Sequence, residues 1–303
     1  MAFTQRQWPG LVMAFTSALL YSTLGIFVKL AYQYNLPVTT IVALRMVLGS
    51  TFLWLALLLN QRERRNWKIA SRDWPVLLGG MVLTYGISEL AYFMGLQLVP
   101  AGVSIFLIYL YPALVVLIAY LLYRERPTRR KLYVALTCFW GCAMLSFNSS
   151  GQMSFSPVGI FFILLSALCI ALYTACSQRL LQNYSPLVVS AWTLSPVGIV
   201  FVLIDWRNLP GYIAFPLEAW LIMLGMAVFA TFISLLLFFG AVSRLGAAHT
   251  ALVSTIEPIA TASLAAWILA ERMTLWQMFG AAVILGGLIL LEWPAKRSRQ
   301  IRN

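Results

Sequence analysis

The chain contains ten apolar stretches, each long enough to cross a lipid bilayer as a helix. A hydrocarbon core of ~30 Å requires about 20 apolar residues in helical form. The stretches cover residues 9–32, 38–59, 75–97, 100–122, 131–148, 157–180, 187–204, 218–243, 246–269 and 274–293. They are continuous apolar runs without two-residue alternation, which predicts a helix bundle and not a membrane β-barrel. The connections between them are short, so we expect the function to lie inside the bundle.

The composition supports this prediction. Of the 303 residues, 61% are hydrophobic and 10% are charged, against roughly 45–50% and about 25% in soluble domains. Such a chain is neither a water-soluble globular enzyme nor a disordered protein. The sequence therefore predicts an all-α integral membrane protein.

The net charge of +12 follows membrane topology. Of the 21 Lys and Arg residues, only Arg207 and Arg272 fall in one set of alternate loops, and Lys29 and Arg45 lie inside apolar stretches. The others lie in the opposite loops and at the two ends of the chain. The positive-inside rule then predicts cytoplasmic N- and C-termini. Topology and contact with anionic lipid account for the basic clusters, and we expect no nucleic-acid binding.

An internal repeat divides the chain into two halves of five stretches. With an offset of 146, Pro112 matches Pro258 and Ser88 matches Ser234, and with an offset of 149, Ser17 matches Ser166. The predicted units are residues 1–148 and 157–303, joined by a linker at 149–156. An odd number of spans in each half forces the two halves into opposite orientations. Such inverted repeats are typical of secondary transporters, whose binding site lies near the membrane midplane between the halves.

The repeat pattern also resembles the EamA family of the drug/metabolite transporter superfamily. The resemblance rests on a proline-containing span, a Glu-Arg pair and a glycine-rich last span, as in Glu257-Pro258, Ala270-Glu271-Arg272 and Gly286-Gly287. The first half carries the related elements Tyr111-Pro112 and Arg124-Glu125-Arg126. This resemblance implies ten helices, alternating access and, in most members, export of metabolites such as amino acids or toxic compounds. It does not identify a substrate.

Polar side chains inside the apolar stretches are the candidate binding residues, because such groups are costly in a bilayer. Helical spacing places Tyr85, Ser88, Glu89 and Tyr92 on one face of the third stretch. In the ninth stretch, Ser254 and Glu257 share a face. Tyr111 in the fourth stretch and Tyr173 in the sixth complete the predicted set. These stripes either converge on a cavity or hold helices together by hydrogen bonds, and both interpretations stay open.

Glu257 is the strongest candidate, because it lies near the middle of its stretch. It is predicted to take up a proton or to bind a substrate amine, and the alternative is a permanently protonated structural residue. Pro258 and its counterpart Pro112 are predicted hinges, since proline cannot donate a helical hydrogen bond. His249 is a second candidate for proton transfer. For Glu89, an ion pair with Arg45 is an alternative to substrate binding.

We therefore predict a secondary carrier of a bacterial cytoplasmic membrane that exports small amphipathic metabolites, above all amino acids or related compounds. Coupling to protons stays open. A carrier or multidrug exporter for nucleosides, vitamins or lipophilic cations is the alternative. An intramembrane enzyme or a channel is less favoured, because the sequence contains neither catalytic motifs nor an ATP site. With one histidine and no CxxC pair, we expect neither a metal nor another cofactor. The expected partners are the lipid bilayer and a small solute, and the chain is a monomer or a homodimer.

Overall fold

The computed structural model describes residues 8–64, 66–111, 155–245, 256–271 and 273–292, together with residues 114, 136–137, 140–141, 144, 250 and 253–254. The elements assigned within these residues are all helices. The fold is therefore all-α, as predicted, over the part of the chain that can be described.

Six helical segments are long and apolar enough to cross a membrane. They are α1 and α2 (Trp8–Tyr21 and Leu24–Tyr32), α3 (Val38–Leu59), η2 and α5 (Val76–Leu83 and Thr84–Leu98), α9 (Pro157–Leu181), α10 (Pro186–Ile204), and α11, η4 and α12 (Leu217–Ala227, Val228–Ile233 and Ser234–Leu245). They coincide with the first, second, third, sixth, seventh and eighth predicted stretches. At ~1.5 Å per residue, a helix as long as α3 reaches about 33 Å, which matches the bilayer core.

The other predicted stretches are described only in part. The helices there are α6 (Ala101–Ile108), α14 (Ile256–Ile268) and α15 (Leu275–Glu292). Most of the fifth stretch, 131–148, lies outside the described residues. The prediction of ten spanning helices is thus supported for six segments and stays a prediction for the rest.

Three of the long segments are less regular than the apolar pattern predicts. The first is interrupted at residues 22 and 23, where the hydroxyls of Ser22 and Thr23 donate to the carbonyls of Leu19 and Leu20 at 2.7 and 2.6 Å. Such bonds back to the preceding turn compete with the helical ladder. The segment at the third predicted stretch begins as the π-helix η2. The segment at the eighth predicted stretch contains the π-helix η4 between α11 and α12. Hydropathy measures length and burial but not hydrogen-bond register, so it cannot show these breaks.

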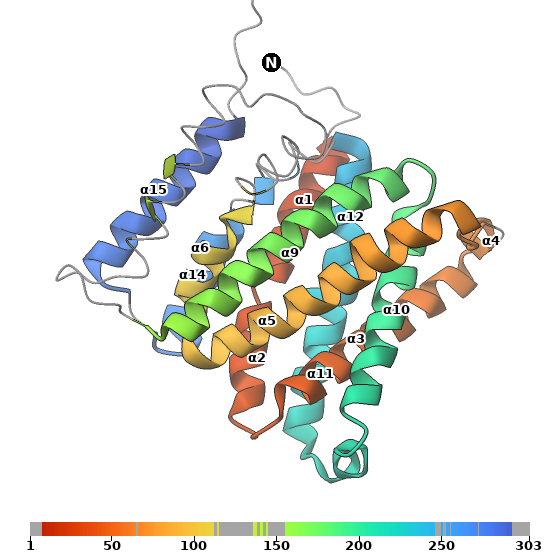
Figure 1. Ribbon diagram of the computed structural model, residues 1–303, viewed down its shortest axis with the longest axis horizontal. Coiled ribbons are helices and arrows are strands. Elements are labelled where there is room, and N and C mark those ends of the chain that lie inside the picture. The colour runs from red at the N-terminus through yellow and green to blue at the C-terminus, as the bar shows by residue number, and fades with distance from the viewer. Residues whose placement is uncertain are drawn as a thin grey trace, which may run out of the picture.

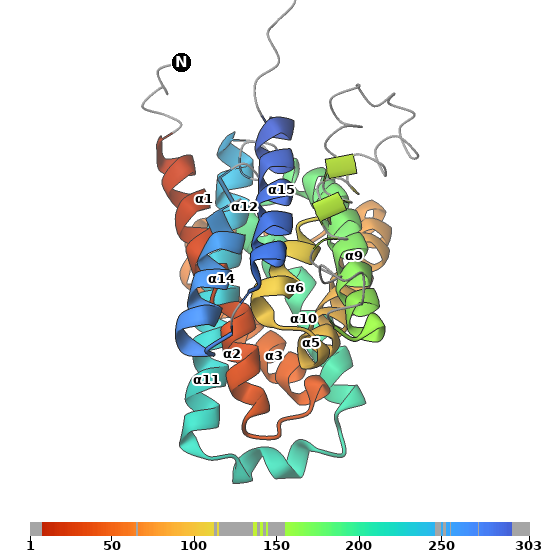
Figure 2. The same cartoon turned by 90° about the vertical axis from the view of Figure 1, so that its left-hand side faces the viewer.

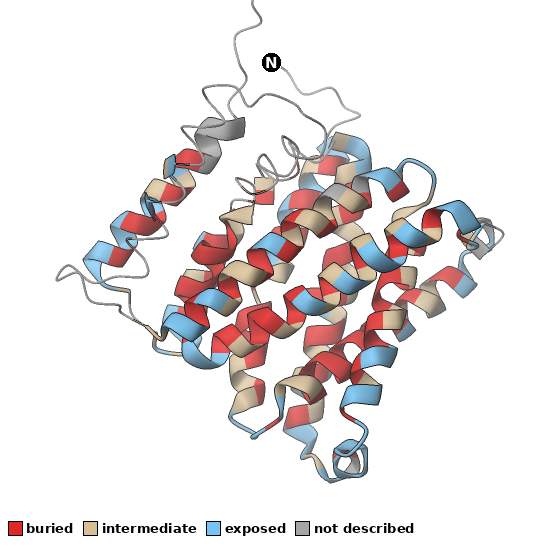
Figure 3. Cartoon of the chain, viewed as in Figure 1, coloured by how far each residue is buried: buried red, intermediate tan, exposed pale blue. Residues whose placement is uncertain are grey.

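The two halves of the chain pack against each other helix by helix. The most extensive contacts are those of α5 with α9, α3 with α10, α1 with α12, and α6 with α14 (Figures 1 and 2). In each pair one helix comes from each half. Gly159 lets α9 approach α5 closely, because a Cβ atom added there would lie 2.7 Å from Cβ of Leu98. Figure 3 shows buried residues where the helices face one another and exposed residues on their outer faces.

Large apolar side chains cover much of the outer surface. Leu59, Trp267 and Leu275 are each more than four-fifths exposed. A soluble monomer rarely exposes so much apolar surface, whereas hydrocarbon tails would cover it. The exterior is therefore suited to lipid.

Two hydroxyl pairs join the halves at related positions. The Ser17 hydroxyl of α1 donates to the carbonyl of Ser234 of α12 at 2.8 Å. Between α5 and α9, the hydroxyl oxygens of Ser88 and Ser166 lie 2.9 Å apart. Ser17 matches Ser166 and Ser88 matches Ser234 in the sequence repeat, so the two contacts are counterparts.

Candidate functional site

A cavity of about 110 Å³ lies where the helices of the two halves meet. We call it the central cavity. Six of the predicted site residues line it: Tyr85, Glu89, Tyr111, Tyr173, Ser254 and Glu257. The convergence predicted from four separate apolar stretches is therefore present. The role of these residues in binding stays a prediction.

A smaller cavity of about 40 Å³ adjoins the first. Ser88 and Tyr92 line this adjoining cavity and not the central one. Ser88 is also engaged in the hydroxyl pair with Ser166, which fits the interpretation of a contact between helices. Glu89 and Glu257 line both cavities, so the two carboxylates lie at the boundary between them.

Glu89 forms a buried ion pair with Arg45. Nη1 of Arg45 donates to Oε2 of Glu89, and Nε donates to the hydroxyl of Thr231 at 2.7 Å. Arg45 is fully buried and Glu89 is 4% exposed. The alternative that the sequence left open for Glu89, a pair with Arg45, is confirmed. Because Arg45 neutralises its charge, Glu89 contributes no net charge to the cavity wall.

Glu257 has a different environment. Tyr109 donates to its carboxylate, with Oη 2.9 Å from Oε2. Within the part of the chain that the structure describes, the ion pairs involve other acidic residues, and no Lys or Arg pairs with Glu257. An ionised Glu257 would therefore give the central cavity one uncompensated negative charge. Such a cavity can hold a proton or a small organic cation.

The hinge predicted at Pro258 has a visible consequence. Proline leaves the carbonyl of Ser254 without a helical donor, and the Tyr109 hydroxyl donates to this carbonyl at 2.6 Å. Pro258 is the third residue of α14. The other predicted hinge, Pro112, and the predicted proton relay, His249, lie outside the described residues.

Tyrosine rings form much of the cavity wall. The rings of Tyr85 and Tyr173 are 5.1 Å apart between centroids, and those of Tyr109 and Tyr111 are 5.7 Å apart. Rings of this kind can contact apolar groups or attract a cation through their faces. The wall therefore combines aromatic surface with Glu257, a carboxylate that pairs with no Lys or Arg of the described residues.

Sequence reasoning missed several residues of the wall. They are Ser17, Tyr21, Thr174, Ser234 and Phe238. The repeat offered a signal for the two serines, because it matches Ser17 with Ser166 and Ser234 with Ser88. Tyr109, one of the tyrosines that lie deep in the apolar stretches, also lines the cavity. Tyr109 and Tyr111 would lie on nearly opposite faces of a continuous helix. Instead α6 ends at Ile108, and a turn follows at Tyr109–Leu110. Because of this turn, both rings reach the cavity.

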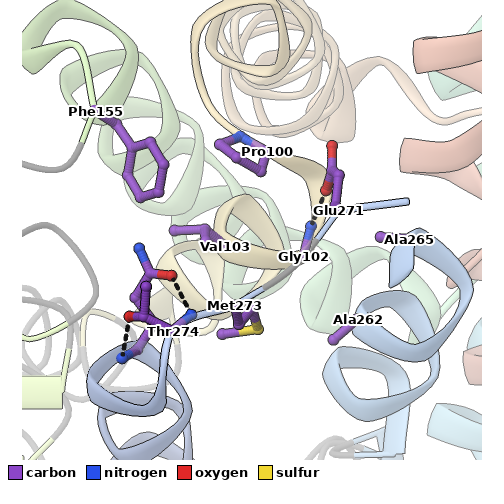
Figure 4. A pocket seen from close by; sticks show the side chains of 10 residues that line it. Pro100, Gly102, Val103, Phe155, Ala262, Ala265, Glu271, Met273 and Thr274 are labelled. Atoms are coloured by element: carbon purple, nitrogen blue, oxygen red, sulfur yellow. Dashed lines mark hydrogen bonds between the residues drawn. The ribbon is translucent and has the colours of Figure 1, made fainter. Parts of the chain in front are cut away.

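A third cavity of about 340 Å³ lies at the end of the bundle where α6 begins. Figure 4 shows the Glu271 carboxylate bound to the backbone N–H of Gly102 on its wall, and the N···O distance is 3.2 Å. The same carboxylate lies 3.9 Å from Nζ of Lys29. Glu271 thus connects the second half of the chain to α2 and α6 of the first. We regard this as a contact that closes one end of the bundle.

The helical fold and the cavity between the two halves agree with what the comparisons with known proteins show. The model of the EamA-like transporter family matches residues 8–147 and again residues 157–293. The uncharacterized transporter YcbK of Bacillus subtilis is 25% identical over 278 residues, 89% of this chain and 88% of YcbK. The uncharacterized inner membrane transporter YicL of Salmonella typhimurium is 26% identical over 210 residues, 69% of this chain and 70% of YicL.

A solved crystal structure also resembles this fold. Its TM-score is 0.63 at 20% sequence identity, and the match covers 94% of this chain and 96% of that one. At this level of identity the likeness concerns the fold alone.

Proposed function

Because the chain belongs to the EamA-like transporter family, we propose that it is a secondary carrier that exports small amphipathic metabolites, above all amino acids and related compounds. The observation that carries the proposal is the central cavity, in which tyrosine rings surround Glu257, a carboxylate without a basic partner among the described residues. The ammonium group of an amino compound complements both features, through charge and through cation–π attraction.

The size of the cavity favours small metabolites over drug-sized compounds. Its volume is about 110 Å³. Sites for drug-sized ligands measure roughly 300–1,000 Å³. The alternative of a multidrug exporter would require the cavity to widen several-fold, so we place amino acids first.

We propose that transport proceeds by alternating access between two inverted halves, residues 1–148 and 157–303. The reciprocal packing of α1 with α12 and of α5 with α9 supports an inverted relationship, as does the pair of matching serine contacts. In this mechanism Glu89 and Glu257 lie between the central cavity and the adjoining cavity, where the substrate must pass. Glu257 binds either a proton or the substrate ammonium, which couples export to proton uptake, and His249 relays the proton.

The charge pattern of the loops supports an orientation with both termini in the cytoplasm of a bacterial cell. Such an orientation exposes the basic clusters to the anionic inner leaflet. The inner membrane location of the relative YicL, as its name states it, supports the same assignment.

Counterflow in proteoliposomes tests the function. Vesicles are loaded with the twenty amino acids and common polyamines, labelled copies are added outside, and exchange is followed by mass spectrometry with and without a pH gradient. We expect saturable exchange of a few compounds that emerge chemically unchanged. Flux without saturation would indicate a channel, altered products would indicate an enzyme, and exchange of nucleosides or lipophilic cations alone would overturn the substrate class.

A further inference from the structure

The hydroxyl group of Tyr173 is buried in the wall of the central cavity and has no hydrogen-bond partner in the part of the chain that the structure describes. Tyr173 is 7% exposed, and no described residue donates to its oxygen or accepts from it. Other hydroxyls of the wall are engaged: Tyr109 with Ser254, and Thr174 with the carbonyl of Ile170 at 2.8 Å. Buried polar groups are nearly always paired, so an unpaired hydroxyl at a cavity indicates a partner that enters the cavity.

The position of Tyr173 relative to Glu257 suggests what that partner is. Tyr173 belongs to α9, and its ring contacts Tyr85 of α5. Glu257 belongs to α14, which packs against α6. The hydroxyl and the carboxylate thus come from two different helix pairs that face one cavity. A solute that contacts both would carry two polar groups.

The charges near Tyr173 permit an anionic group there. Tyr85 and Glu89 lie one turn apart on α5, and Glu89 would repel an anion if it were unpaired. Arg45 neutralises it, and Nη2 of Arg45 is itself buried with no hydrogen-bond partner among the residues that the structure describes. An anion on this wall is therefore not repelled by a net negative charge, whereas an anion beside Glu257 would be.

We propose that the Tyr173 hydroxyl recognises the carboxylate of a zwitterionic substrate whose ammonium group lies at Glu257. The tyrosine O–H donates to a carboxylate oxygen, and the bond is strong because its acceptor is charged. The inference rests on the proposed function and narrows it, since amines without a carboxylate would lack this contact. The alternative occupant is an ordered water, which would satisfy the hydroxyl without any bearing on selectivity.

The test compares three pairs of compounds that differ by one carboxylate: L-alanine with ethylamine, L-leucine with 3-methylbutylamine, and L-phenylalanine with 2-phenylethylamine. The counterflow KM of each labelled amino acid and the inhibition constant of each amine are measured for the wild type and for Tyr173→Phe. The exposed Tyr34→Phe is the control. We expect Tyr173→Phe to raise the KM of transported amino acids about tenfold, as for the loss of a charge-assisted hydrogen bond, and to change amine inhibition less than about twofold.

The outcomes separate this inference from the proposed function. If the wild type exchanges amino acids but Tyr173→Phe leaves their KM unchanged, the hydroxyl serves a water only and the inference is wrong. An equal effect on amino acids and amines would also overturn it, because the ring and not the carboxylate contact would then be involved. If the wild type exchanges none of the amino acids, the substrate class itself is wrong and the inference falls with it.

Thermal unfolding of the empty carrier in detergent provides a second check. Tyr173→Phe removes a hydroxyl that has no partner among the described residues, so the melting temperature should stay the same or rise. A marked fall would show that the hydroxyl bonds to the protein itself, and the proposed role in recognition would be wrong.

Discussion

The hydroxyl oxygen of Tyr109 lies 2.9 Å from Oε2 of Glu257 and 2.6 Å from the carbonyl oxygen of Ser254. A tyrosine hydroxyl has one proton, so it can donate fully to only one of these acceptors at a time. When Glu257 takes up a proton, its carboxyl can donate to Tyr109, which frees the tyrosine proton for Ser254. The charge of Glu257 is thereby linked to the carbonyl that Pro258 leaves without a helical donor.

Tyr109→Phe should therefore impair transport. The variant keeps the ring but leaves the Ser254 carbonyl without this donor, and it removes the donor to Glu257. We expect the counterflow rate to fall about tenfold, which corresponds to ~1.4 kcal/mol. Rates equal to the wild type, with Tyr34→Phe as the control, would show that the Tyr109 contact has no part in the transport cycle.

Glu257→Gln should remove the pH dependence of transport. Glutamine has nearly the same shape as glutamate but can neither ionise nor hold a proton, so it cannot alternate between proton and ammonium. We expect exchange of amino compounds to drop at least tenfold, because a charge-assisted contact is lost, and the residual rate to be flat with pH. The exposed Glu218→Gln on α11 serves as the control.

A Glu257→Gln carrier with the same rate and the same pH profile as the wild type would contradict the proposed role. Loss of rate with an unchanged pH profile would mean that Glu257 binds substrate but that another group takes up the proton.

The sequence predicts the helical class, the two halves and the core of the candidate site. These features follow from hydropathy, from the repeat and from helical spacing, which together place Tyr85, Glu89 and Glu257 at one cavity. Spacing assumes unbroken helices, and it fails where a helix ends inside the bundle. The turn at Tyr109 is such a place, and it brings in a residue that periodicity assigns to another face. Contacts between distant residues, such as Ser17 with Ser234, depend on packing that no single stretch encodes.

The buried Arg45–Glu89 pair should show strong coupling in a double-mutant cycle. Arg45→Met alone leaves the Glu89 carboxylate buried without its counter-charge, and loss of one partner of such a pair costs about 3–5 kcal/mol. Replacing both with methionine removes both charges, so we expect most of that loss to be recovered. The measurement is thermal unfolding of the four proteins in one detergent.

A pair whose basic partner is exposed supplies the control for this cycle. Arg72 lies 3.8 Å from Asp73, with its side chain 79% exposed, and Arg72→Met should change stability by less than about 1 kcal/mol. A double variant no more stable than Arg45→Met alone would show that the stability depends on shape at these positions and not on charge compensation.

Asp205 should make stability depend on pH in the acidic range. The residue follows α10 and accepts hydrogen bonds from Thr39, Thr40, Asn208 and Tyr212 at 2.5–2.9 Å. Burial alone would raise the pKa of its carboxyl, but these four hydrogen bonds outweigh burial and hold the pKa below its usual range. These bonds connect α3 with the segment that follows α10, at the end of the bundle away from the N-terminus (Figure 2).

The sign of the effect follows from the lowered pKa. The stabilisation from Asp205 is complete above the pKa of an unfolded aspartate, ~3.9, and is lost as the pH falls through the lower pKa of the folded state. Asp205→Asn should therefore be less stable than the wild type at pH 7, by about 1–3 kcal/mol for unmatched buried hydrogen bonds. The gap between the two proteins should narrow below pH ~4. Thermal unfolding of both proteins from pH 7 to pH 3 measures this difference in stability. Tyr212→Phe, which removes one of the four hydrogen bonds, should lose less stability than Asp205→Asn. A difference that does not change with pH would show that the Asp205 charge does not contribute to stability.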